Sequence, residues 1–79
     1  MDLRVFRVPD YEAAHLAAYV LATDGVAAQA GVRHHQPYVS VRCDRTDIES
    51  VIRGLVPAAV PVNIEHLPLP APGERPSFW

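Results

Sequence analysis

The sequence contains no lysine and only one cysteine, and this composition limits the covalent links and metal sites that the chain can form. With Cys43 alone, the chain can form neither an internal disulfide nor a zinc site built from several cysteines. All seven basic residues are arginines, which together with the abundant alanine, valine and proline indicates GC-rich coding. We therefore expect a bacterial or phage protein from a high-GC genome.

Long apolar runs and glycine-rich loops are also missing. No segment approaches the roughly 18 apolar residues that a membrane span requires, and the N-terminus lacks the apolar core of a signal peptide. We therefore expect a cytoplasmic protein that makes no membrane contact. The four glycines stand singly, which excludes a glycine-rich phosphate loop. The net charge of −2 gives no reason to favour a polyanionic partner.

The chain has enough apolar residues for one small folded domain. Its apolar fraction of 49% over 79 residues is typical of a globular protein and too high for a disordered one. At this size a single core is only marginally stable. We expect the chain to gain further burial by forming a homodimer or by docking its own C-terminal tail.

The clearest pattern lies between Tyr38 and Leu55. Residues 38–43 alternate, which predicts a half-buried strand with its valines on the core side. Thr46 and Glu49 then have the spacing of a capping box and predict that a helix starts there. The apolar stripe of this helix is Ile48, Val51, Ile52 and Leu55.

The N-terminal half predicts a similar strand and helix. Residues 3–8 alternate, but either Leu3 and Val5 or the set of Phe6 and Val8 could face the core. Pro9 ends this strand, and Asp10 is a good N-cap for the helix that follows. That helix spans residues 11–23, with the predicted stripe Ala13, Leu16, Ala17, Val20 and Leu21.

Two weaker strands complete the pattern. Residues 26–33 alternate but are rich in alanine and glycine, which favours an edge position. A turn at residues 34–37 joins them to the strand that begins at Tyr38. Residues 60–65 alternate as a last strand, and Pro61 again favours an edge.

The resulting order of strand, helix, strand, strand, helix and strand repeats one supersecondary unit. It resembles the ferredoxin-like βαββαβ layout, an α+β two-layer sandwich. That resemblance implies a four-stranded antiparallel sheet with two helices on one face and the other face open. We assign residues 1–67 to this domain and residues 68–79 to a proline-rich tail that ends in Phe78 and Trp79.

The open face and the tail are the predicted contact surfaces. In this layout the first and third strands are central, so we expect Arg4 and Phe6 to lie beside Tyr38, Ser40 and Arg42. Exposed aromatic residues commonly anchor interfaces. We interpret the chain as a small non-enzymatic interaction or regulatory module. The residues predicted to bind its protein partner are Phe6, Tyr38, Arg42, Phe78 and Trp79.

The alternative interpretation is a single-stranded nucleic-acid-binding domain. Aromatic residues on the two central strands occupy the positions at which RNA-recognition domains stack bases. The chain resembles that family only in this placement, because neither strand carries its signature. The residues that would bind nucleic acid are Arg4, Phe6, Arg33, Tyr38 and Arg42.

The histidines do not form a recognisable catalytic or metal site. Adjacent residues on an extended chain point in opposite directions, so His34 and His35 are poorly placed to hold one metal ion. His15 shares a helix side with Glu12 and Tyr19, an arrangement that is typical of an exposed helix face. We therefore expect no catalytic residues, no metal and no cofactor.

Overall fold

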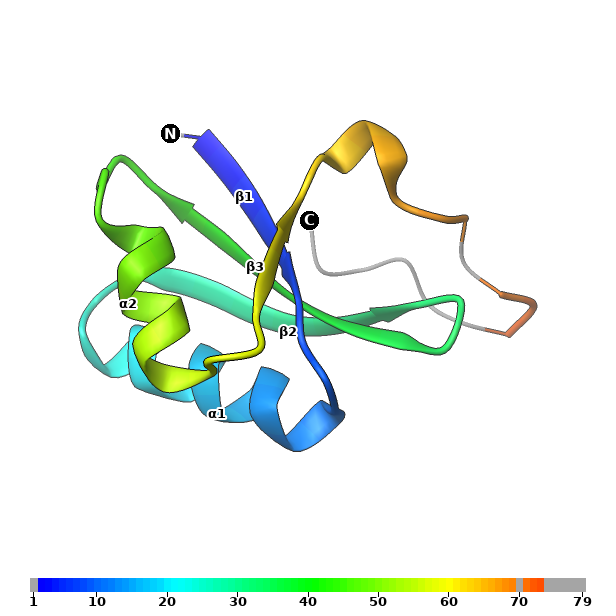
Figure 1. Ribbon diagram of the computed structural model, residues 1–79, viewed down its shortest axis with the longest axis horizontal. Coiled ribbons are helices and arrows are strands. Elements are labelled where there is room, and N and C mark those ends of the chain that lie inside the picture. The colour runs from blue at the N-terminus through cyan, green and yellow to red at the C-terminus, as the bar shows by residue number, and fades with distance from the viewer. Residues whose placement is uncertain (1, 70, 74–79) are drawn as a thin grey trace.

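The computed structural model describes residues 2–69 and 71–73. Its elements are β1 (Asp2–Arg7), α1 (Tyr11–Thr23), β2 (Ala27–Arg33), β3 (Gln36–Cys43), α2 (Ile48–Leu55), β4 (Val60–Val62) and the 3-10 helix η1 (Ile64–His66). The strands form one antiparallel sheet in the order β2-β3-β1-β4, and both helices lie on one side of it (Figure 1). This confirms the predicted ferredoxin-like topology with the first and third strands at the centre.

The ends of α1 are formed by the residues that the sequence indicates. The Asp10 carboxylate accepts a hydrogen bond from the Ala13 amide at 2.7 Å, which satisfies a donor in the first turn. Gly25 takes a positive φ of 81° directly after the helix. The Val26 amide then donates back to the Leu21 carbonyl at 2.9 Å, which completes a Schellman-type helix end.

The start of α2 differs from the prediction. The capping box of Thr46 and Glu49 is wrong, because Asp47 occupies the N-cap position and makes no side-chain cap. The Arg45 guanidinium instead donates to both carboxylate oxygens of Asp47, at 3.0 and 2.9 Å, and thereby lowers the pKa of Asp47. Glu49 pairs with Arg53 one turn later at 3.5 Å.

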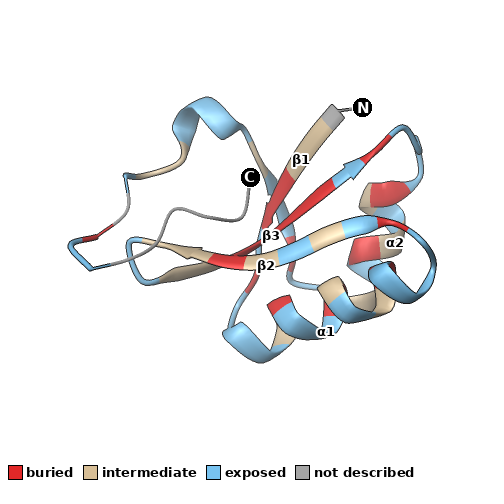
Figure 2. Ribbon diagram, turned by 180° about the vertical axis from the view of Figure 1, so that it is seen from behind, coloured by how far each residue is buried: buried red, intermediate tan, exposed pale blue. Residues whose placement is uncertain are grey.

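The main core lies between the helices and the sheet (Figure 2). Its buried members are Phe6, Val8, Ala14, Ala17, Leu21, Val26, Val39, Val41, Cys43, Ile48, Ile52, Val56 and Ala59. On α1 the buried positions are therefore rotated from the predicted stripe, and Leu16 is 52% exposed. The small side chains of Ala14 and Ala17 let α1 approach the sheet closely. No helix in the described residues is long and apolar enough to cross a membrane.

β4 is shorter than predicted because Asn63 redirects the chain. The Asn63 side-chain oxygen accepts a hydrogen bond from the Glu65 amide at 3.1 Å, and its carbonyl accepts from the His66 amide at 2.9 Å. These bonds favour a tight turn over continued pairing with β1. The predicted strand over residues 60–65 is thus correct only as far as Val62.

The β2–β3 hairpin turns at His34 and His35, which have positive φ values of 49° and 65°. A two-residue hairpin turn requires this conformation, which asparagine and glycine normally supply. The two imidazole rings lie 5.9 Å apart between centroids and are tilted by 48°. The turn aligns Arg33 with Gln36 and so sets the register of the whole hairpin.

Candidate interaction surface

The open face, the side of the sheet opposite the helices, is built from alternate residues of each strand. Residues aligned across an antiparallel pair point to the same side. Leu3 is aligned with Arg42, Val5 with Ser40 and Arg7 with Tyr38. From the other strands, the same side receives Ala27, Gln29, Gly31, Arg33, Val60 and Val62.

The predicted facing of β1 is wrong. Phe6 is aligned with Val39 and is only 1% exposed within the main core, and Arg4 is aligned with Val41 on the same side of the sheet. Both residues therefore lie on the helix side of the sheet. This facing buries Phe6 and Val8, which are both 1% exposed, in the main core beneath the helices.

A small apolar cluster, which we call the open-face cluster, occupies the middle of the open face. Val5 and Tyr38 form its buried centre, with exposed fractions of 1% and 5%. Leu3, Val62 and Leu67 pack against this centre and are partly buried. Val62 lies on this side of the sheet because it is aligned with Val5.

The first residues of the proline-rich stretch contact this cluster. Leu67 packs against it, and the Pro68 carbonyl accepts a hydrogen bond from an Arg33 guanidinium nitrogen at 3.3 Å. Ala71 is also buried, at 6% exposed. Part of the open face is thus covered by Leu67 and Pro68 of the same chain. Phe78 and Trp79 lie outside the described residues.

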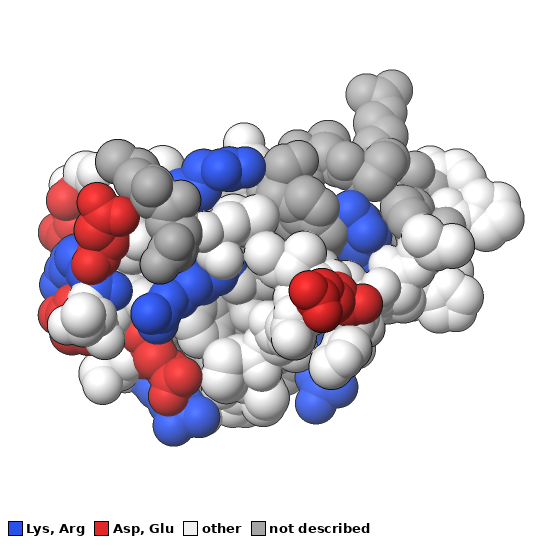
Figure 3. All heavy atoms as spheres, turned by 90° about the horizontal axis from the view of Figure 1, so that it is seen from above, with Lys and Arg blue, Asp and Glu red and all other residues white. Residues whose placement is uncertain are grey.

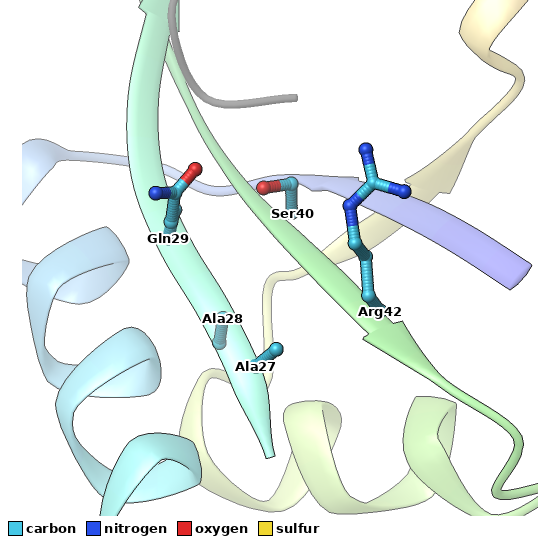
Figure 4. Close-up of a pocket in the computed structure, with 5 residues that line it drawn as sticks. All are labelled: Ala27, Ala28, Gln29, Ser40 and Arg42. Carbon is cyan, nitrogen blue, oxygen red and sulfur yellow. The ribbon is translucent and has the colours of Figure 1, made fainter. Parts of the chain in front are cut away.

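A shallow pocket remains near the end of the open face where β2 begins. It has a volume of about 290 Å³ and is lined by Ala27, Ala28, Gln29, Ser40 and Arg42. Figure 4 shows Gln29, Ser40 and Arg42 rising from β2 and β3 away from the helices. The pocket therefore combines a cation, an amide and a hydroxyl beside small apolar side chains.

The charged side chains around this face are unevenly distributed. Figure 3 views the molecule from above and shows most of the visible acidic side chains at one end, where they lie beside basic side chains, while other basic side chains lie among uncharged atoms. Asp44 and Asp47 belong to the link between β3 and α2. Arg42 is exposed and aligned with Ala27, so its guanidinium has a small neighbour on β2.

A second depression lies along the edge between β1 and β4. It has a volume of about 540 Å³ and is lined by residues 3–6 of β1, residues 61–65 and Glu49 of α2. It forms because β4 stops pairing with β1 before Asn63, whereas β1 extends beyond the last paired residue, Val5. The sequence pattern predicted continued pairing there and so gave no signal for it.

The five residues of the nucleic-acid alternative do not form one surface. Arg33, Tyr38 and Arg42 lie on the open side, whereas Arg4 and Phe6 lie on the helix side. The ring of Tyr38 is buried within the open-face cluster, so it offers no exposed plane for base stacking in this arrangement.

The titratable residues form no metal centre in the part of the chain that the structure describes, which contains no group of three potential ligands. His15 packs against Tyr11 on the exposed side of α1, with ring centroids 5.1 Å apart. Cys43 is buried and belongs to the main core. No family model matches this chain, and neither a curated protein nor a solved structure shows significant similarity to it.

Proposed function

We propose that this chain is a small interaction module that binds an extended segment of a protein partner across its open face. The observation that carries the proposal is the polar pocket beside the open-face cluster. Extended segments bind sheet surfaces when apolar side chains find small hydrophobic contacts and a few polar groups fix their position. The exposed Gln29 and Arg42 in the lining of this pocket supply such polar groups.

The chain's own C-terminal segment supports this mode of binding. Leu67 and Pro68 already lie on the open face through one apolar contact and one hydrogen bond to Arg33. A partner segment would use the neighbouring, uncovered part around Arg42 in a similar way. Phe78 and Trp79 are proposed to add apolar contacts to that partner.

Arg42 indicates an acidic group in the partner. A guanidinium recognises a carboxylate with two parallel hydrogen bonds, and such charge-assisted bonds are stronger than neutral ones. The neighbouring Gln29 is exposed, and its side-chain amide can accept from or donate to the backbone of a bound segment. We therefore propose a partner segment with an aspartate or glutamate next to an apolar residue.

The test is selection of peptides from a random displayed library on the immobilised full-length chain. We expect enrichment of sequences that pair an acidic with an apolar residue. The Arg42→Ala variant should bind the enriched peptides about tenfold to a hundredfold more weakly, the loss that removal of a charge-assisted hydrogen bond produces.

Arg53→Ala is the matched control, because it removes one exposed arginine from α2 on the helix side of the molecule. It should leave peptide affinity unchanged. Failure to enrich any peptide, or equal losses in the two variants, would overturn the proposal. Tight binding of a single-stranded oligonucleotide at low salt would favour the nucleic-acid alternative instead.

A further inference from the structure

The two edge strands of the sheet, β2 and β4, differ in the features that prevent pairing with a further strand. β4 has only three residues, and one of them is Pro61. β2 has seven residues, continuous register with β3 from Ala27 to Arg33, and no proline. Edge strands that remain unpaired are normally short, bulged, charged or interrupted by proline. β2 has none of these features before its last residue.

The backbone groups on the free edge of β2 can be identified from the register. The closing pair of a two-residue hairpin, here Arg33 and Gln36, exchanges hydrogen bonds, and every second pair does the same. The intervening residues therefore direct their N–H and C=O groups outward. The Val8 amide donates a hydrogen bond to the Pro37 carbonyl, so this carbonyl points from β3 toward β1 and not toward β2. Its direction agrees with the alternation. The outward residues are Ala28, Ala30 and Val32.

We propose that the free edge of β2 pairs antiparallel with β2 of a second copy, which joins two sheets into one. In the symmetric register, Ala30 lies opposite Ala30 of the second copy and Ala28 lies opposite its Val32. All outward groups of these three residues then find partners. This surface is separate from the open face, so it extends the proposed function without depending on it.

The charges at the ends of β2 favour a second copy in this orientation. Asp24 precedes the strand, whereas Arg33 is its last residue and is followed by two histidines. Antiparallel pairing places the acidic end of one copy beside the basic end of the other, and parallel pairing would place like ends together. The side chains of β2 project above and below the sheet rather than across its edge, so they do not obstruct the approach.

α1 adds a second contact area to the same interface. This helix packs mainly on β2, and its buried stripe is Ala14, Ala17 and Leu21. In a right-handed crossover from β1 to β2, the helix residue that follows each buried residue in the sequence faces the free edge of β2. These positions are His15, Ala18 and Ala22. The two alanines let the helices of the two copies approach, which adds buried area that a strand pair alone would lack.

Sedimentation velocity across a range of protein concentrations tests the proposal. The wild-type chain should form a dimer, and Ala30→Pro should weaken it about thirtyfold, because each copy loses one hydrogen-bond donor at the centre of the interface. Proline at this position spares the bonds between β2 and β3. Arg42→Ala should dimerise normally, while Ala30→Pro should still bind the selected peptides, so the two surfaces are distinguished.

Amide hydrogen exchange of the wild-type chain provides a second measurement that needs no variant. The amides of Ala28, Ala30 and Val32 should become protected as protein concentration rises, while the amide of Arg33 should be protected throughout. A wild-type monomer at every concentration would overturn the proposal. So would a dimer that leaves these three amides exchanging freely, or protection that does not depend on concentration.

Discussion

The two faces of the sheet are built from the same strands but differ in what covers them. On the helix side, side chains from four elements meet in a continuous core that contains Phe6, Val39 and Ile52. On the open side of the described chain, the buried centre of the apolar cluster consists of Val5 and Tyr38, with the buried Ser40 aligned beside Val5. The segment around Leu67 covers part of this cluster. The difference shows that the larger part of the buried core lies on the helix side. The open side is the face on which we propose that a partner binds.

The largest expected effect is on the helix side. Phe6→Ala should lower the free energy of unfolding by about 3–5 kcal/mol, because it removes a fully buried aromatic ring from the main core. Urea denaturation measures this change. Tyr19→Ala is the matched aromatic control, since Tyr19 is 71% exposed, and it should change stability by no more than about 0.5 kcal/mol. Equal losses would contradict the assignment of Phe6 to the core.

A pair of valines compares the two faces directly. Val39 and Val5 lie on adjacent central strands and are 0% and 1% exposed, but they point to opposite sides of the sheet. Val39→Ala should cost about 2.5 kcal/mol, whereas Val5→Ala should cost about 1 kcal/mol because the covering segment can relax into the space. Thermal or urea unfolding of both variants measures the difference. A larger loss for Val5→Ala would reverse the comparison.

The covering segment itself should contribute less. Leu67→Ala should lower stability by about 1 kcal/mol, since the side chain is only partly buried against the open-face cluster. Leu69→Ala removes the same group from a position that is 82% exposed and should have almost no effect. If the two variants unfold at the same urea concentration, the segment does not pack on the sheet in solution.

The smallest effect on stability is expected at the pocket. Arg42→Ala should stay within about 0.5 kcal/mol of the wild-type free energy of unfolding, because the guanidinium is exposed. The same variant should lose peptide affinity. Circular dichroism during urea unfolding, combined with a peptide-binding titration, measures both. A variant that unfolds readily would show that Arg42 is needed for the fold.

The order of the elements could be predicted from the sequence because each element carries its own signal. The alternation of residues 38–43 and the cap at Asp10 depend on neighbours close in the chain, and the structure confirms both. Gly25 likewise ends α1 as its conformational freedom suggests.

The facing of β1 could not be predicted because both sides of that strand carry apolar residues. Leu3 and Val5 compete with Phe6 and Val8, and only the packing of Phe6 and Val8 against the helices decides between them. Phe6 therefore does not belong to the candidate interaction surface, whereas Gln29 of β2, which was not among the predicted binding residues, does. The end of β4 was missed for a local reason, because a side-chain hydrogen bond at Asn63 outweighed the alternating pattern.

The central claim, that the open face is the contact surface, is tested most directly by mapping a selected peptide onto the chain with NMR chemical shifts. The account predicts that the largest changes occur at the amides of Gln29, Ser40 and Arg42, and that α1 and α2 are nearly unaffected. Chemical-shift changes that are concentrated on the helices, with no change on the open face, would contradict it.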